Sequence, residues 1–259
     1  MAASRAAPPL AAYVLHSYDW SESSLIVDLF TRDQGRVVVV AKGAKRPTSN
    51  FRPLLLPFHP LSVWLARAAA DANDEVKSLR AVEWGGGTPL PSAALMSGFY
   101  LNELLQKGLA RQDPHPALFD AYAGTLEALA AAATADGEAV TLRAFEFVLL
   151  RELGLLPELD SVTANAQTLA PGHRYALRPE TGIAPDSDGA LGTTWVALQA
   201  ALQHGSLAAL RQACAVDAAA LRVPLRNLVH YHLATAQLRT RRVGLQMQRL
   251  AASPDRHER

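Results

Sequence analysis

The sequence predicts a two-domain α+β protein, with a small β-barrel at the N-terminus and an all-α domain after it. Short segments rich in β-forming residues fill the chain before residue 86, and apolar residues at helical spacing fill the chain after it. Between the two lies the strongest breaker in the sequence, Gly85-Gly86-Gly87-Thr88-Pro89. We therefore place the domains at residues 1–86 and 87–259, and residues 1–10 form a loose Ala/Pro tail.

Five segments before the break favour strands because they are rich in β-branched and aromatic residues. The clearest is the valine run that ends at Val40, which follows the hairpin turn Asp33-Gln34-Gly35. The predicted strands are Tyr13–His16, Ser24–Thr31, Arg36–Val40, Leu61–Leu65 and Val76–Trp84. Five is the strand count of an OB-fold barrel. A five-stranded sandwich or an SH3-like barrel would give almost the same pattern.

Five segments after the break repeat apolar residues at intervals of three and four, as helices do. Gly108 and Gly154 lie where helix C-caps are expected. The predicted helices are Ser92–Leu109, His115–Ala133, Glu138–Leu153, Thr194–Gln203 and Asp217 to about Leu250. Residues 160–192 are rich in Pro, Gly, Asp and Thr and predict an irregular insertion, in which only Arg174–Leu177 has the character of a strand.

The composition sets limits on the class of protein. The chain has 259 residues, of which 49% are hydrophobic and 19% charged, so it can bury a core. A net charge of +1 restricts any nucleic-acid surface to a local patch. The single cysteine, Cys214, excludes an internal disulfide or a cysteine-based zinc site. Neither a signal-peptide pattern nor a long apolar run is present, which predicts a cytoplasmic protein without a membrane partner.

The first candidate site is a basic run from residue 32 to residue 52. It holds six cations against one acid, Asp33: Arg32, Arg36, Lys42, Lys45, Arg46 and Arg52. Cations at a strand end of a small barrel can bind phosphates. They can equally be a solvated hairpin end that protects an edge strand. Four nearby aromatic residues could stack on bases if exposed, or fill the core if buried: Tyr18, Trp20, Phe51 and Phe58.

A second basic stretch contains six arginines and no acid: Arg222, Arg226, Arg239, Arg241, Arg242 and Arg249. A solvated helix face normally mixes charges of both signs, so this stretch favours an anionic partner. The alternative is that these arginines pair with acids elsewhere, such as Glu103, Glu146 or Glu152.

Catalytic and metal-binding motifs are missing from the sequence. There is no G-x-S-x-G, P-loop or H-E-x-x-H pattern. His230 and His232 are two residues apart, so a helix would point them in different directions, and Asp113 with His115 suits a capped turn. We therefore expect a binding protein that uses neither a cofactor nor a metal. A nucleic-acid-processing hydrolase and an adaptor that binds acidic proteins remain the alternatives.

The order and spacing of several segments resemble the RecO family of bacterial recombination mediators. The matching segments are Tyr13–His16 with Glu22–Thr31, Gly35–Arg46, Pro57–Leu61, Tyr100–Leu105, Asp113–Tyr122 and Phe145–Gly154, and more loosely Tyr175–Ile183 and Leu238–Val243. The resemblance implies an OB-fold followed by a helical domain. It further implies that the protein binds single- and double-stranded DNA and anneals complementary strands. With RecR it would help RecA load onto DNA coated with single-stranded DNA-binding protein (SSB), which places it at the nucleoid.

The resemblance also implies site residues. The DNA contacts of the family in the barrel correspond here to Arg36, Lys42, Lys45, Arg46 and Arg52. The helical domain of the family receives the acidic-hydrophobic C-terminal tail of SSB. Arg143 is the candidate for its carboxylate, although Ala144 replaces the second basic residue of the family's pair. A structural alternative pairs Arg143 with Glu138 or Glu146.

Many members of the family carry a zinc module of four cysteines in the region of residues 160–192. Here Ser161, Thr163 and Asn165 stand where a cysteine pair would be, so we expect the module to be metal-free.

Overall fold

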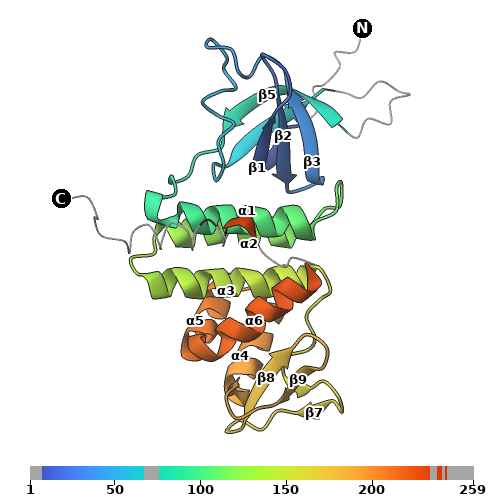
Figure 1. Ribbon diagram of the computed structural model, residues 1–259, viewed down its shortest axis with the longest axis vertical. Coiled ribbons are helices and arrows are strands. Elements are labelled where there is room, and N and C mark those ends of the chain that lie inside the picture. The colour runs from blue at the N-terminus through green and yellow to red at the C-terminus, as the bar shows by residue number, and fades with distance from the viewer. Residues whose placement is uncertain (1–7, 67–75, 234–237, 241–242, 244–259) are drawn as a thin grey trace, which may run out of the picture. The chain divides into compact units, whose positions relative to one another are not determined.

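The computed structural model describes residues 8–66, 76–233, 238–240 and 243. Five strands come first, and helices interrupted by a group of short strands follow (Figure 1). The predicted α+β class, with the barrel before the helices, is confirmed.

The N-terminal strands form a closed barrel. They are β1 (Leu10–Asp19), β2 (Leu25–Thr31), β3 (Gly35–Ala41), β4 (Leu61–Leu65) and β5 (Val76–Trp84). They are hydrogen-bonded in the order β1-β2-β3-β5-β4, and β4 returns to β1. All neighbours are antiparallel except β3 and β5, which run parallel. Closure decides against the sandwich alternative and agrees with the OB-type barrel.

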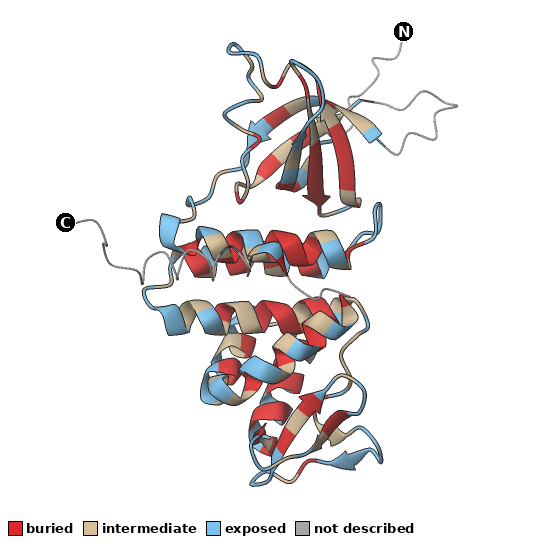
Figure 2. Cartoon of the chain, viewed as in Figure 1, coloured by how far each residue is buried: buried red, intermediate tan, exposed pale blue. Residues whose placement is uncertain are grey.

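The strands β2 and β3 are buried on both faces, as their red ribbons in Figure 2 show. Val27 and Val39 point into the barrel core, where both are fully buried. Phe30 packs outside that core on the helix α2 (Pro116–Ala130), with its ring centroid 5.3 Å from that of Phe119. This two-sided burial explains why the valine run is continuous rather than alternating with polar residues.

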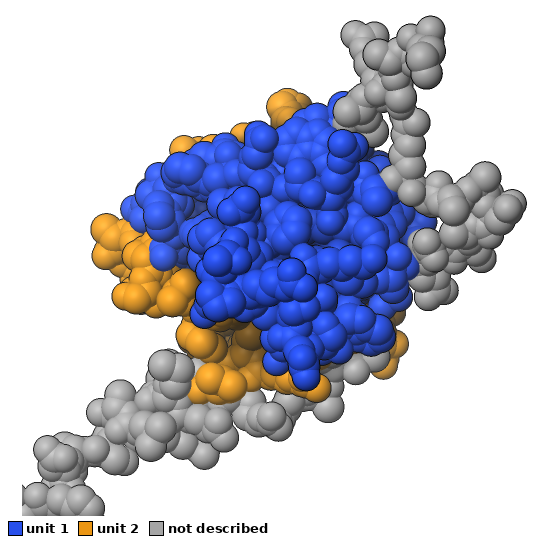
Figure 3. Space-filling view, turned by 90° about the horizontal axis from the view of Figure 1, so that it is seen from above, with its two compact units in different colours: residues 1–90, 108–131 blue, residues 91–107, 132–259 orange. Residues whose placement is uncertain are grey.

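The chain divides into two compact units (Figure 3). The barrel unit comprises residues 1–90 and 108–131, and the helical unit comprises residues 91–107 and 132–259. The glycine-rich break thus lies close to residue 90, where the chain first passes from the barrel unit to the helical unit. The chain then returns to the barrel unit at residue 108 to form α2. Aromatic contacts explain this return, because Tyr13 of β1 packs on Phe119 and Tyr122 of α2 at centroid distances of 5.4 and 5.0 Å.

In the part of the chain that the structure describes, the helical unit contains a short 3-10 turn, η1 (Ser92–Ala94), and the helices α1 (Leu95–Gly108), α3 (Ala135–Glu152), α4 (Gly192–Gln203), α5 (Leu207–Val216) and α6 (Ala218–His232). Its core is built around fully buried aromatic residues of α3 and α4, including Phe147 and Trp195. The helix α6 ends at His232, where a turn at Leu233 interrupts the helix predicted from Asp217 to about Leu250. Residues 239, 240 and 243 are again helical, and the rest of the predicted helix beyond Leu233 lies outside the described residues, apart from residue 238.

The insertion predicted to be irregular contains five short strands: β6 (Ser161–Val162), β7 (Gln167–Thr168), β8 (Arg174–Arg178), β9 (Gly182–Pro185) and β10 (Ala190–Leu191). They form a sheet of order β10-β8-β9 and the pair β6-β7. Only β8 was expected. Most of the other strands have two residues, too few to show an alternating pattern.

Candidate nucleic-acid interface and basic pocket

The basic loop, residues 42–52, follows directly on β3. Its first turn requires Gly43, whose φ is +73°, and the amide of Arg46 donates to the Gly43 carbonyl at 3.1 Å. Ala44 is fully buried and fixes the loop to the barrel core. The side chains on either side of this anchor, Lys42 and Arg46, are exposed. The fold therefore presents these two cations to solvent from a well-defined turn.

Lys45 ties the basic loop to the β1–β2 loop, residues 20–24. Its backbone amide donates to the Ser23 carbonyl at 2.9 Å, and its ammonium donates to the Ser21 carbonyl at 2.8 Å. The ammonium also lies 3.2 Å from Asp19 Oδ1. Lys45 is thus partly engaged within the protein, in contrast to Lys42 and Arg46.

Two cations of the predicted run have buried or tertiary partners. The Arg36 guanidinium binds Asp28, with Nη2 2.7 Å from Oδ2, and Asp28 is 2% exposed. Arg32 binds both carboxylate oxygens of Asp120 on α2, at 2.9 and 2.8 Å, and this contact lowers the pKa of the Asp120 carboxyl. The geometry favours structural roles for Arg32 and Arg36.

The remaining cations give the basic loop its charge. Lys42, Arg46 and Arg52 are exposed, and none of the three has a carboxylate partner among the residues that the structure describes. The sequence contains no acid from Gln34 to Ala70. A local positive potential of this kind attracts a polyanion even though the whole chain is nearly neutral.

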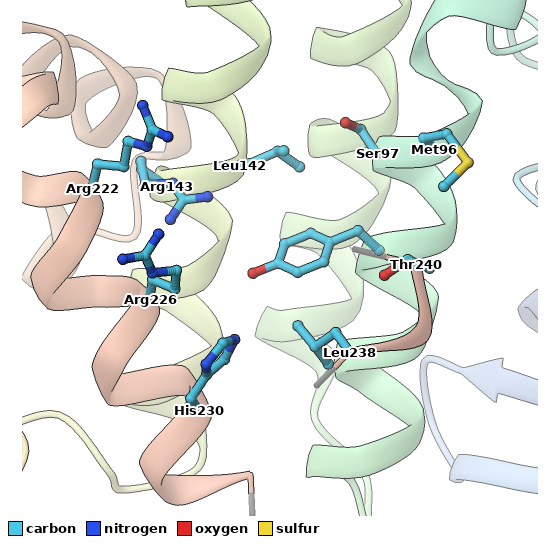
Figure 4. Close-up of a pocket in the computed structure, with 10 residues that line it drawn as sticks. Met96, Ser97, Leu142, Arg143, Arg222, Arg226, His230, Leu238 and Thr240 are labelled. Carbon is cyan, nitrogen blue, oxygen red and sulfur yellow. The ribbon is translucent and has the colours of Figure 1, made fainter. Parts of the chain in front are cut away.

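The helical unit contains a basic pocket of about 280 Å³, lined by residues of α1, α3, α6 and the segment 238–240. Arg143, Arg222, Arg226 and His230 line one side of the pocket in Figure 4, and Met96 and Leu238 lie on the other. The second basic stretch thus supplies Arg222, Arg226 and His230 at intervals of four residues, which is one face of a helix. The four-residue spacing is present in the sequence, but the net charge of the stretch does not reveal it.

Arg143 has one of the partners proposed for its structural role. Its Nη1 lies 2.8 Å from Oε2 of Glu146, which is fully buried and also accepts a hydrogen bond of 2.6 Å from the Tyr100 hydroxyl. Burial raises the pKa of Glu146, although Arg143 and Tyr100 act in the opposite direction. The other proposed partner, Glu138, instead accepts a hydrogen bond from Ser97. By contrast, Arg222 and Arg226 have no carboxylate partner within the described ranges.

Glu103 on α1 holds the segment 238–240 in place through the backbone rather than through the arginine side chains. It accepts hydrogen bonds from the amides of Arg239 and Thr240 at 2.8 and 2.9 Å, and from the Thr240 hydroxyl at 2.7 Å. Burial acts to raise the pKa of Glu103, but these bonds and Lys107 outweigh it and lower the pKa. Arg239 itself is exposed, and Arg241, Arg242 and Arg249 lie outside the described residues.

The described residues include no cluster of three or more His, Cys, Asp or Glu side chains with the geometry to hold a metal ion. Among the helices of the described part, none is long and apolar enough to cross a membrane.

A closed five-stranded barrel with an exposed cationic loop, followed by helices around a basic pocket, defines a two-domain protein of the OB-barrel class. The family model described as Recombination protein O N terminal matches residues 10–84, and that described as Recombination protein O C terminal matches residues 92–242. The chain therefore belongs to the RecO family, as its resemblance predicted, and this membership assigns it to DNA repair.

Two relatives show how far the likeness extends. The DNA repair protein RecO of Polaromonas naphthalenivorans (strain CJ2) is 51% identical over 245 residues, which cover 92% of this chain and 96% of the relative. The DNA repair protein RecO of Verminephrobacter eiseniae (strain EF01-2) is 48% identical over 259 residues, which cover 96% of this chain and all of the relative.

Proposed function

We propose that the chain is a non-enzymatic recombination mediator that binds single- and double-stranded DNA through the basic loop and anneals complementary strands. Cations bound to phosphates release condensed counterions and reduce the repulsion between two strands. The reaction would be a pairing of strands, so it would consume no cofactor.

The observation that carries this proposal is the exposure of Lys42, Arg46 and Arg52 in a stretch without acids. Lys45 adds charge beside them while holding the neighbouring loop. Arg36 is the weakest of the predicted contacts, because its guanidinium already binds Asp28.

We further propose that the basic pocket receives the acidic-hydrophobic C-terminal tail of SSB. A peptide that ends in an apolar residue and a free carboxylate needs a cation beside an apolar wall. Arg222 and Arg226 suit the carboxylate better than Arg143, which is paired with Glu146. RecR would be a second partner, and together they would help RecA load onto SSB-coated DNA at the nucleoid.

Fluorescence anisotropy with labelled single strands and duplexes at several salt concentrations tests the proposed DNA binding. A strand-annealing assay tests whether the bound strands are paired. We expect both substrates to bind and the affinity to fall steeply with salt. A protein that binds acidic peptides but neither DNA substrate would favour the adaptor alternative. Cleaved or modified DNA in the presence of Mg²⁺ would favour the hydrolase.

A further inference from the structure

Aromatic rings lie at every second position at the end of β1 and directly after it: His16 and Tyr18 are on the strand, and Trp20 is the first residue of the β1–β2 loop. His16, Tyr18 and Trp20 are all exposed, and the exposed fractions of Tyr18 and Trp20 are 49% and 64%. Residues two apart on a strand share a face, and the rings of His16 and Tyr18 meet edge to face at a centroid distance of 4.4 Å. An exposed row of large rings is an informative feature, because such rings are usually buried in a small barrel.

This aromatic row adjoins the basic loop. Both chain neighbours of Trp20 contact the Lys45 ammonium. The Asp19 carboxylate lies 3.2 Å from it, and the Ser21 carbonyl accepts a hydrogen bond from it at 2.8 Å. The basic loop is therefore adjacent to the segment that holds Tyr18 and Trp20, with Lys45 at the junction. Two acids lie there, of which Asp19 is paired with Lys45 and Glu22 is exposed.

The other candidate aromatic residues of the sequence are not available at this surface. Phe58 is 6% exposed, and Phe51 is half-buried against the barrel core. The rings that can meet a ligand beside the basic loop are thus Tyr18 and Trp20.

We propose that Trp20, assisted by Tyr18, stacks on unpaired bases and makes this surface prefer single-stranded DNA to duplex. The inference rests on the proposed DNA binding by the basic loop. Phosphate contacts alone serve both forms of DNA, whereas an aromatic ring needs a free base face, which a duplex does not offer. Every base has such a face, so the preference is for single strands rather than for a sequence.

Trp20→Ala tests the proposal, with Trp84→Ala as a matched control, since Trp84 is 60% exposed on the same barrel. Each variant is titrated with a labelled mixed-sequence oligonucleotide and with its duplex. Trp20→Ala should weaken single-strand binding about five- to one-hundred-fold, the contribution of one stacked base, and leave duplex binding within about twofold. Trp20→Phe should restore part of the loss, and Trp84→Ala should match the wild type on both substrates.

The outcomes separate this inference from the proposal on which it rests. If Trp20→Ala binds single strands as the wild type does, or loses single-strand and duplex binding equally, the stacking role is wrong while DNA binding stands. If the wild type binds neither substrate, the proposed function and the inference both fail.

Discussion

Asp28 on β2 and Arg36 on β3 form a buried ion pair across the two strands. The Arg36 Nε lies 3.0 and 2.9 Å from the two carboxylate oxygens of Asp28, and Nη2 lies 2.7 Å from Oδ2. Nη1 donates to the carbonyl of Leu109, and the Arg36 carbonyl accepts from the amide of Gln112. One arginine thus connects the two strands to the segment that precedes α2.

Arg36→Ala should destabilise the barrel unit, because it leaves the Asp28 carboxylate buried without its cation. We expect a loss of about 3 kcal/mol in the free energy of unfolding, measured by urea denaturation, since breaking a buried pair is costly. Arg36→Lys should recover only part of it, because an ammonium cannot form the same bidentate contact. Arg46→Ala is the control: Arg46 is exposed, so its replacement should change the free energy of unfolding by less than about 0.5 kcal/mol. A stable Arg36→Ala with weakened DNA binding would instead make Arg36 a DNA contact.

The barrel was predictable because the local sequence pattern of each strand is enough to identify it. The β-rich segments, the Asp33-Gln34-Gly35 turn and the glycine break need only neighbouring residues to be recognised. The position of α2 was not predictable, since its helical pattern does not reveal that Phe119 and Tyr122 pack on β1. Tertiary contacts between distant segments decide that assignment.

The basic pocket should bind an acidic peptide with a free carboxyl end through Arg222 and Arg226. Replacing either by Ala should cost roughly 1–3 kcal/mol in affinity for an SSB-tail peptide, the scale of hydrogen bonds to charged groups. Titration of a labelled peptide measures this, and Arg151→Ala is the control, because it removes an equal charge from an exposed site on α3.

Arg143→Ala should behave differently from those two variants. It removes the partner of the fully buried Glu146 and should lower the melting temperature, whereas Arg222→Ala should not. A peptide with an amidated C-terminus should bind weakly to the wild type. Equal affinity of the amidated and free peptides, or of Arg222→Ala and the wild type, would contradict the role of the pocket.

Glu103 should make the segment 238–240 sensitive to acid. A carboxyl whose pKa is lower in the folded protein stabilises the fold above its ordinary range, and this stability is lost as the pH falls through the folded pKa. The hydrogen-exchange protection of the Arg239 and Thr240 amides should therefore fall on acidification. Glu103→Gln should lower the protection near neutral pH and remove most of its pH dependence, whereas exposed Glu127→Gln should change neither. Protection that is independent of pH in the wild type would disprove the role.

The insertion at residues 160–192 should be stable without zinc. Two hydrogen bonds join Thr163 and Ile183. The Thr163 amide donates to the Ile183 carbonyl at 3.0 Å, and the Ile183 amide donates to the Thr163 hydroxyl oxygen at 2.8 Å. A chelator should leave the melting temperature unchanged, and elemental analysis should find no stoichiometric zinc. Gly182→Ala should lower the melting temperature, because its φ is +67° and a Cβ would lie 2.2 Å from Thr163 Oγ1. One zinc per chain would refute the expectation.

The candidate sites were predictable in part. Counting charges along the sequence found both basic stretches, but counting cannot separate Lys42 and Arg46, which are exposed, from Arg36, whose partner Asp28 lies eight residues earlier. The pocket could not be predicted without the fold, because its walls come from three helices that are far apart in the sequence, α1, α3 and α6. The four-residue spacing of Arg222, Arg226 and His230 was the one local sign of it.

The most direct test measures how the affinity for duplex DNA depends on salt when the cations of the basic loop are removed. The double variant Lys42→Ala/Arg46→Ala keeps the contacts of Lys45 with the β1–β2 loop. It should reduce the slope of log affinity against log salt concentration by about 2 if each cation neutralises one phosphate. Adding Lys45→Ala should bring the reduction to about 2–3, and the affinity should fall alike for all sequences. An unchanged slope and affinity in the double and triple variants would remove the basic loop from the DNA interface.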